Sequence, residues 1–176
     1  EVRSNSKKAI TKLRKLGVKN IIMLTGDTKQ KAKMIADELG INEVRAELLP
    51  QDKAKIVKEL MNEGKKVAFV GDGINDAPAL ISAHVGISMS RGADIAKATA
   101  DISLLKDDIM AVVEAKEYAN KTMNLINNNF NATVGINSCI LAGATFGVFS
   151  PIVTAVLHNG TTIGLLFNSI KGVNIR

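Results

Sequence analysis

Two carboxylates and a carboxamide follow an apolar run near the middle of the chain. Residues 70–80 read VGDGINDAPAL, so Asp72, Asn75 and Asp76 come directly after the apolar residues 67–70. The two glycines of this segment let the backbone approach a neighbour closely and adopt unusual dihedral angles. Mg²⁺ prefers such oxygen ligands, uses one or two carboxylates and shares its other positions with water and phosphate oxygens. The segment therefore predicts a magnesium site for phosphoryl transfer.

The same acids have a simpler possible role, because Asp is common at helix N-termini. Asp72 or Asp76 could cap the helix that is expected to follow them. Capping requires only one acid, however, and leaves the other polar side chains unexplained. We therefore favour the metal site, with Asp72 and Asp76 as the ligands of Mg²⁺.

A second turn of this kind could bind an anion. Thr25 and Gly26 follow the apolar residues 21–24 and offer a hydroxyl and backbone N–H groups to a phosphate. Capping of the next helix by a neighbouring Asp or Thr explains the same residues equally well. Lys53, three residues after Pro50, could direct a point charge at the same phosphate.

The elements that must position these residues alternate between strands and helices. Alternation of this kind predicts an α/β fold with right-handed crossovers and a parallel sheet. Short apolar runs without alternation are typical of strands buried on both faces. Residues at the carboxyl ends of such strands line a common crevice, so Thr25 and Asp72 are predicted to share one site. Strands are expected at 21–24, 44–46, 67–70, 85–88 and 102–105. The first helix is expected to be capped by Ser4 or Ser6 and to run to Leu16, the second to end at Gly40, and others to lie at 50–61, 77–83, 94–99 and from 109 onward.

The composition changes sharply after Lys121. Residues 122–170 contain no Asp, Glu, Lys or Arg. These roughly 49 residues match two membrane-spanning helices of ~20 residues with a short turn. We expect a cytoplasmic domain at 1–121 and a transmembrane hairpin at 122–176, with helices at about 126–149 and 152–170. A helical hairpin buried in the core of a soluble protein is the alternative.

Charges on either side of the hairpin indicate its orientation. Lys116 and Lys121 precede it, and Lys171 and Arg176 follow it, so both ends are predicted to lie on the cytoplasmic side. Polar side chains within it would be costly in lipid and are expected to face other helices or a permeant ion. The set comprises Asn137, His158, Asn159, Thr161, Thr162 and Asn168.

Other features of the composition exclude whole classes of protein. A single cysteine rules out an internal disulfide, and with only two histidines a structural zinc site is not expected. The net charge is +6, but aromatic residues make up only 3% of the chain. A groove that binds nucleic acid normally stacks bases on aromatic rings, so no nucleic-acid partner is predicted.

Three segments in this order resemble one family. They are Thr25-Gly26-Asp27, Pro50-Gln51-Asp52-Lys53 and the decapeptide at residues 71–80. These segments are similar to the later motifs of the phosphorylation domain in P-type cation-transporting ATPases, which have a haloacid-dehalogenase fold. The uncharged hairpin resembles the C-terminal helices of the heavy-metal (P1B) branch.

The resemblance implies a role for each matching residue. Thr25, Gly26 and Lys53 would contact the transferred phosphoryl group, and Asp72 would be the principal protein ligand of Mg²⁺. Asn75 and Asp76 would support that ion and the phosphate. ATP would be the substrate, bound mainly by a domain that these residues do not include. The whole protein would be an ATP-driven exporter in a bacterial cell membrane.

The aspartate that such pumps phosphorylate is absent, because the sequence contains no Asp-Lys-Thr-Gly-Thr. The resemblance therefore implies a C-terminal part whose sheet lacks the nucleophile strand between residues 21–24 and 67–70. The partners would include the rest of the ATPase chain and membrane lipid. Two other functions stay open: a soluble Mg²⁺-dependent phosphatase of the same superfamily, and a truncated, non-catalytic membrane protein that binds metal or partners.

The transported ion is predicted from the hairpin. Residues 157–162 read LHNGTT, which departs from the Met-Ser of copper pumps and the Asp of common zinc and cadmium pumps. Imidazole suits Zn, Co, Ni or Cu, and amide oxygen suits harder ions such as Mn. Because the segment departs from the pattern of the copper pumps, a divalent ion of the set Zn, Co, Mn, Ni or Cd is favoured over Cu. A hydrogen bond between helices is an equally good explanation of the histidine. The candidate residues are Asn131, Asn137, His158 and Asn159.

Overall fold

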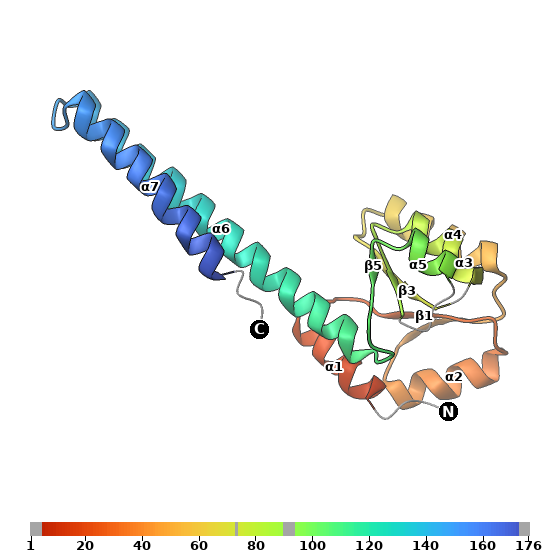
Figure 1. Cartoon of the computed structure of the whole chain (residues 1–176). Coiled ribbons are helices and arrows are strands. Elements are labelled where there is room, and N and C mark those ends of the chain that lie inside the picture. Colours follow the sequence, from red (N-terminus) through yellow and green to blue (C-terminus); the bar gives the residue numbers. More distant parts are fainter. Residues whose placement is uncertain (1–4, 73, 90–93, 173–176) are drawn as a thin grey trace. The chain divides into compact units, whose positions relative to one another are not determined.

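The computed structural model describes residues 5–72, 74–89 and 94–172. They form two compact units, Glu1–Lys116 and Glu117–Arg176 (Figure 1). Ser4, Gly73 and Arg176, which the sequence analysis names, lie outside the described residues.

The first unit contains two parallel sheets. In one, β1 (Ile22–Leu24) pairs with β2 (Glu43–Arg45), with Met23 opposite Val44. In the other, the order is β3 (Ala68–Gly71), β4 (Val85–Ser88) and β5 (Ile102–Ser103). The predicted α/β fold with parallel strands is thus confirmed, but the strands are divided between a two-stranded and a three-stranded sheet. Within the described residues, β1 and β3 are not paired with each other.

Helices connect successive strands at nearly the predicted positions. Their ends follow local chemistry: Gly40 ends the second helix with a left-handed φ of 69°, and Pro50 opens the third at a position that needs no N–H donor. The carboxylate of Asp52 then accepts the N–H of Leu49 at 2.9 Å. The helices are α1 (Ser6–Lys15), α2 (Lys29–Leu39), α3 (Pro50–Asn62), α4 (Ala77–Ser82) and α5 (Asp94–Thr99), and a 3₁₀ turn (Ile74–Asp76) precedes α4.

Some local predictions are wrong. Asn5 precedes α1 in place of a serine cap, and its side-chain amide donates to Asp108 Oδ2 at 3.3 Å. All three residues of β1 are only half-buried, although burial on both faces was expected, because among the described residues β1 has a neighbouring strand, β2, on one side only. The last strand stops at Ser103, and Leu105 is 96% exposed.

One apolar cluster matters most for the arrangement of the polar residues. Val57 of α3 packs with Phe69 of β3 and with Ala79 and Leu80 of α4. Large apolar side chains such as Val57 and Leu80, when fully buried, contribute about 1.5–3 kcal/mol each. The cluster therefore holds the first turn of α3 beside the end of β3, and Leu24 of β1 packs against the same group.

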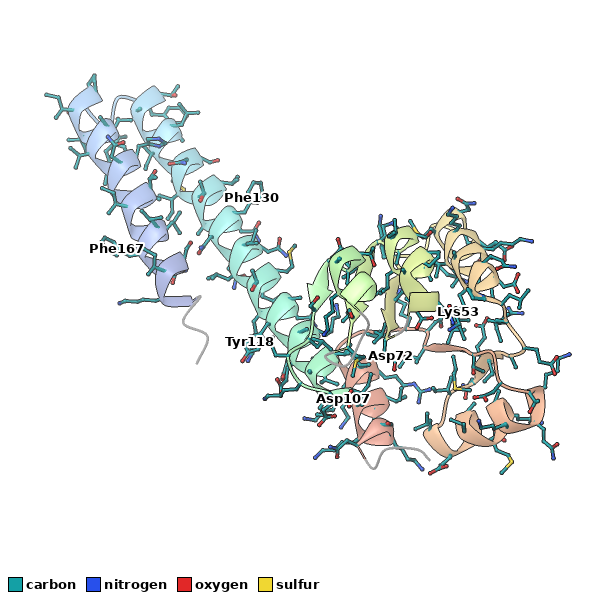
Figure 2. The ribbon with its side chains drawn as sticks, turned by 45° about the vertical axis from the view of Figure 1, so that its right-hand side comes forward. Lys53, Asp72, Asp107, Tyr118, Phe130 and Phe167 are labelled. Carbon is teal, nitrogen blue, oxygen red and sulfur yellow. The ribbon has the colours of Figure 1, made fainter. Side chains whose placement is uncertain are left out.

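The second unit is formed by two long antiparallel helices. α6 (Met110–Thr145) begins in the first unit and α7 (Pro151–Gly172) returns beside it (Figures 1 and 2). The turn between them packs against α6, since a Cβ on Gly143 would lie 2.4 Å from the ring of Phe149. The first expected helix, at 126–149, is too long at its end, because α6 stops at Thr145, whereas the second, at 152–170, lies within α7.

Neither of these helices reaches the hydropathy expected of a membrane span, and no other helix among the described residues does so. The cause is visible in the sequence, since asparagines and one histidine interrupt both apolar runs. Large apolar side chains nevertheless face outward along the hairpin, including Phe130, Phe146, Ile152 and Phe167. The crossing of a membrane by these helices stays a prediction.

Candidate functional site

Gly71, the last residue of β3, makes room for a carboxylate. A Cβ at this position would lie 2.7 Å from Cβ and 2.9 Å from Oδ2 of Asp76. Real side chains do not approach so closely, so any other residue here would displace Asp76. The expectation that a glycine permits a close approach is confirmed at this position.

Asp76 lies at the end of the 3₁₀ turn and is only 7% exposed. Its Oδ1 atom is 2.7 Å from the Nζ atom of Lys53, and its Oδ2 atom accepts the backbone N–H of Asp72 at 3.3 Å. Asp76 occupies the N-cap position of α4, yet its side chain makes no capping hydrogen bond there. The carboxylate therefore holds Lys53 and the start of the loop after β3 and does not cap the helix.

Lys53 and Asp76 form a buried ion pair. Their side chains are 17% and 10% exposed. Removing two charges from water is costly, and their mutual attraction offsets that cost only when the geometry is close. Lys53 comes from the first turn of α3, which the cluster around Val57 packs against β3 (Figure 2). A positive charge is thereby fixed beside the carboxyl end of β3.

Asp72 and Asn75 are exposed at the same strand end. In the described part of the chain, the carboxylate of Asp72 makes no hydrogen bond or ion pair, so its oxygens can take a ligand. No group of three or more His, Cys, Asp or Glu side chains gathers among these residues. Mg²⁺ binds proteins through one or two carboxylates and keeps several waters, so Asp72, with Asp76 behind it, is a donor set that fits this ion.

Thr25 lies in a separate network at the end of β1. Its Oγ1 atom accepts the backbone N–H of Asp27 at 3.1 Å and donates to Asp27 Oδ2 at 3.3 Å. Lys31 Nζ is 2.7 Å from Asp27 Oδ1. The pKa of Asp27 is lowered, mainly by the hydrogen bond from Lys31. The positive charge of Lys31 and the hydrogen bond from Thr25 also lower this pKa, whereas desolvation raises it.

The predicted phosphate and metal residues are thus only partly brought together. Lys53, Asp72 and Asp76 meet at the end of β3. Among the described residues, no hydrogen bond or ion pair joins Thr25 to any of these three. Gly26, beside Thr25, is exposed and approaches Leu48, whose carbonyl oxygen would be 3.3 Å from a Cβ at position 26.

The hairpin brings together two of its four candidate residues. His158 Nδ1 of α7 lies 3.0 Å from Asn137 Oδ1 of α6. Asn131 and Asn159 are exposed and, among the described residues, form no hydrogen bond with either. A hydrogen bond between helices was the alternative expected for His158, and it is present.

Sequence reasoning missed a second polar cluster in the hairpin. Asn168 of α7 donates to Asn129 Oδ1 at 2.7 Å, and Asn129 donates to Ser169 Oγ at 2.7 Å. Asn168 was expected to face another helix, whereas its partner Asn129 was not among the predicted polar contacts. The available signal was the spacing along the sequence, because Asn129 and Asn168 lie at similar distances from the turn at 150–151.

The chain is similar to known hydrolases and to known ATPases. The model of the haloacid dehalogenase-like hydrolases matches residues 1–84. A manganese-exporting P-type ATPase of Mycobacterium leprae is 42% identical over 100% of this chain, and a zinc-exporting P-type ATPase of Mycobacterium marinum is 41% identical over 100% of it. Over its whole length, the chain is thus similar to part of these metal-exporting P-type ATPases.

A solved structure shows the same similarity. A zinc-transporting PIB-type ATPase in its E2.Pi state matches 99% of the chain with a TM-score of 0.89 and 36% identity. The chain corresponds to 28% of that structure and spans 24% of the Mycobacterium leprae protein, about a quarter in each case. Other relatives are named as cadmium-transporting and copper-exporting ATPases, so the names of the relatives do not agree on one ion.

Proposed function

We propose that residues 1–176 are the magnesium- and phosphate-binding part of a phosphorylation domain, followed by two membrane helices of a P1B-type ATPase. The whole protein would use ATP to export a divalent transition-metal ion. The observation that carries this proposal is the buried Lys53–Asp76 pair beside the exposed Asp72 at the end of β3. These three residues lie in two of the three segments that resemble the family's motifs.

The site's own residues suit phosphoryl transfer, in which positioning and charge neutralisation supply most of the catalysis. Asp72 would hold Mg²⁺, with Asp76 and Asn75 supporting it, and the ion would neutralise part of the negative charge of the phosphoryl group. Lys53 would present a positive charge whose place is fixed by Asp76. Thr25 and Gly26 would offer a hydroxyl and an N–H to the phosphate once Thr25 turns from Asp27.

We further propose that the aspartate nucleophile and its strand lie outside residues 1–176. The support is the lack of an Asp-Lys-Thr-Gly-Thr segment, together with the lack of pairing between β1 and β3 among the described residues. A strand inserted between them would complete one parallel sheet and would bring a carboxylate to the end where Asp72 lies.

The hairpin is proposed to cross the membrane, with the first unit and the C-terminus in the cytoplasm. The support is the uncharged segment 122–170 and the exposed apolar side chains of α6 and α7. Asparagine side chains that bond across the helices, such as Asn129 and Asn168, are the arrangement that lipid favours, since no water is there to satisfy them.

The His158–Asn137 pair is the proposed contact for the transported ion. It offers an imidazole nitrogen and an amide oxygen, a combination that suits Zn, Co, Mn, Ni or Cd better than Cu(I), which prefers sulfur. Asn131 and Asn159 would complete the site only after a rotation of the helices.

The decisive test begins with the reading frame upstream of residue 1. A continuous frame that encodes Asp-Lys-Thr-Gly-Thr supports the proposal, and a stop codon directly upstream contradicts it. In the longer protein, metal-stimulated ATP hydrolysis should fall at least about 100-fold in Asp72→Asn, as expected when a group that neutralises transition-state charge is lost. The control Glu63→Gln, at an exposed position, should keep its activity.

Residues 1–176 should not form a phosphoenzyme by themselves. An acid-stable, hydroxylamine-sensitive phosphoenzyme formed by residues 1–176 from ATP would contradict the absent nucleophile. Mg²⁺-dependent hydrolysis of small phosphate esters by the same residues would favour the alternative, a soluble phosphatase.

A further inference from the structure

The chain's positive charge is concentrated in one segment. Residues 2–26 hold seven of its 23 Lys and Arg residues and none of its 17 Asp and Glu residues. The rest of the chain has 16 basic and 17 acidic residues and is therefore nearly neutral. The net charge of +6 is thus a property of α1 and its flanks, and the proposed phosphoryl-transfer site does not use it.

Within α1 the basic residues share one face. At about 100° per residue they occupy an arc of roughly 160°, and the apolar residues Ala9, Ile10 and Leu13 occupy the other side. Ala9 and Ile10 are buried, and Leu13 packs against a cluster around Ile87. We name the exposed arc the basic face; it comprises Lys7, Lys8, Lys12, Arg14 and Lys15, all exposed.

The described part of the chain leaves this charge uncompensated. α2 packs against α1 and carries Asp37 and Glu38, yet no ion pair joins either acid to the basic face among the described residues. Arg14 donates to the carbonyl oxygen of Gly40, which is a neutral acceptor. At the start of α1, Asp108 accepts from the side-chain amide of Asn5.

We propose that the basic face of α1 docks on anionic phospholipid headgroups. A cluster of four to eight Lys and Arg residues beside a membrane binds anionic lipid, with about 1 kcal/mol from each residue, or roughly fivefold in affinity. Four of the five residues are lysines, which act as point charges and suit a diffuse anionic surface better than a single shaped ligand.

Nucleic acid is the other polyanion that could bind the basic face. RNA or single-stranded DNA would need aromatic side chains on which to stack, and no Phe, Tyr or Trp precedes Phe69 in the sequence. The uncharged hairpin in the same chain favours lipid as the occupant. This inference goes beyond the proposed function, which assigns contact with the membrane to the hairpin alone.

The test places a probe at the centre of the basic face. Thr11 lies one turn from both Lys7 and Lys15, and Cys139 is the single cysteine. The full chain with Cys139→Ser and Thr11→Cys, labelled with a fluorophore, is bound to vesicles that carry a nitroxide on the headgroup of a neutral lipid. Flotation confirms that the chain is bound to the vesicles.

The expected result depends on charge. Vesicles with about 30% phosphatidylglycerol should quench the probe at about 0.1 M salt, and about 0.5 M salt should abolish the quenching through screening. Vesicles of phosphatidylcholine alone should not quench it. Neutralising Lys8, Lys12 and Lys15 together to Gln should remove the quenching, whereas the matched change of Lys55, Lys58 and Lys66 should retain it.

Each contrary outcome overturns the proposal in a recognisable way. A probe that is unquenched in anionic vesicles to which the chain is bound leaves the hairpin as the sole membrane contact. Equal quenching by neutral vesicles shows an apolar contact and not an ionic one. Tight binding of an RNA oligonucleotide without quenching assigns the face to nucleic acid.

Quenching without insertion of the hairpin supports this inference and contradicts the proposed membrane crossing.

Discussion

Lys53 Nζ and Asp76 Oδ1 lie 2.7 Å apart between residues that are 23 positions apart in the chain. The pair joins the first turn of α3 to the start of α4, and both side chains are largely withdrawn from solvent. Removal of either charge would leave the other one buried without its partner. The pair therefore contributes to the stability of the first unit as well as to the charge of the site.

Replacement of Lys53 by Met should destabilise the chain strongly. The buried carboxylate of Asp76 would lose its partner, which costs about 3–5 kcal/mol in the free energy of unfolding. Lys65→Met is the matched control, because Lys65 pairs with Glu63 at side-chain exposures of 45% and 60%. Exposed pairs contribute about 0–1 kcal/mol. Urea denaturation followed by circular dichroism measures both, and equal losses would show that the Lys53 pair is not buried in solution.

Magnesium should stabilise the chain through Asp72. A ligand that binds only the folded state raises its stability, and at concentrations well above Kd we expect the midpoint of thermal unfolding to rise by about 2–5 °C. Asp72→Asn should abolish this rise without lowering the midpoint in the absence of magnesium, since the side chain is exposed. Glu59→Gln, at an exposed position of α3, should respond like the unaltered protein. An undiminished rise in Asp72→Asn would place the ion elsewhere.

The pKa of Asp27 should fall below its usual value of 3.8 because Lys31 donates to the carboxylate. A lowered pKa in the folded state stabilises the protein at pH values above the pKa of the unfolded chain. That contribution disappears as the pH falls through the folded pKa, so it is present at pH 6 and lost in strong acid. NMR titration of the carboxyl carbon should show the lowered value and its increase in Lys31→Gln. A pKa that is unchanged in this variant would exclude the ion pair as the cause.

Gly71→Ala should disrupt the site from the backbone side. The added methyl group would lie 2.7 Å from Cβ of Asp76, and overpacking of this kind costs about 1–3 kcal/mol. Gly135→Ala is the control, since nothing lies within 4 Å of its Cβ position in α6. In a helix interior this change is neutral or stabilises by up to about 1 kcal/mol. Thermal denaturation distinguishes the two, and a neutral Gly71→Ala would mean that Asp76 can move away freely.

The elements that could be predicted from the sequence are those with strong local signals. Runs such as Ala68–Val70, bounded by turn residues, gave correct strands, and Gly40 and Pro50 marked helix ends through backbone constraints that act locally. The half-burial of β1 could not be predicted, because it depends on which strand lies alongside.

The candidate site divides in the same way. Asp72 and Asp76 stood out because of their spacing within one turn, whereas the ion pair of Asp76 with Lys53 requires α3 to pack beside β3. Thr25 shows the reverse case. Its local hydrogen bonds with Asp27 satisfy its hydroxyl, so a contact with the distant phosphate residues is not required by the fold.

The division of the strands into two sheets affects how the chain behaves at high concentration. Within the described residues, β1 pairs only with β2, and β3 pairs only with β4. Each therefore presents one row of backbone donors and acceptors to whatever extended segment is nearest. At high concentration that segment is another copy of the same chain, so self-association should increase with concentration, and a short strand-forming peptide added in excess should suppress it.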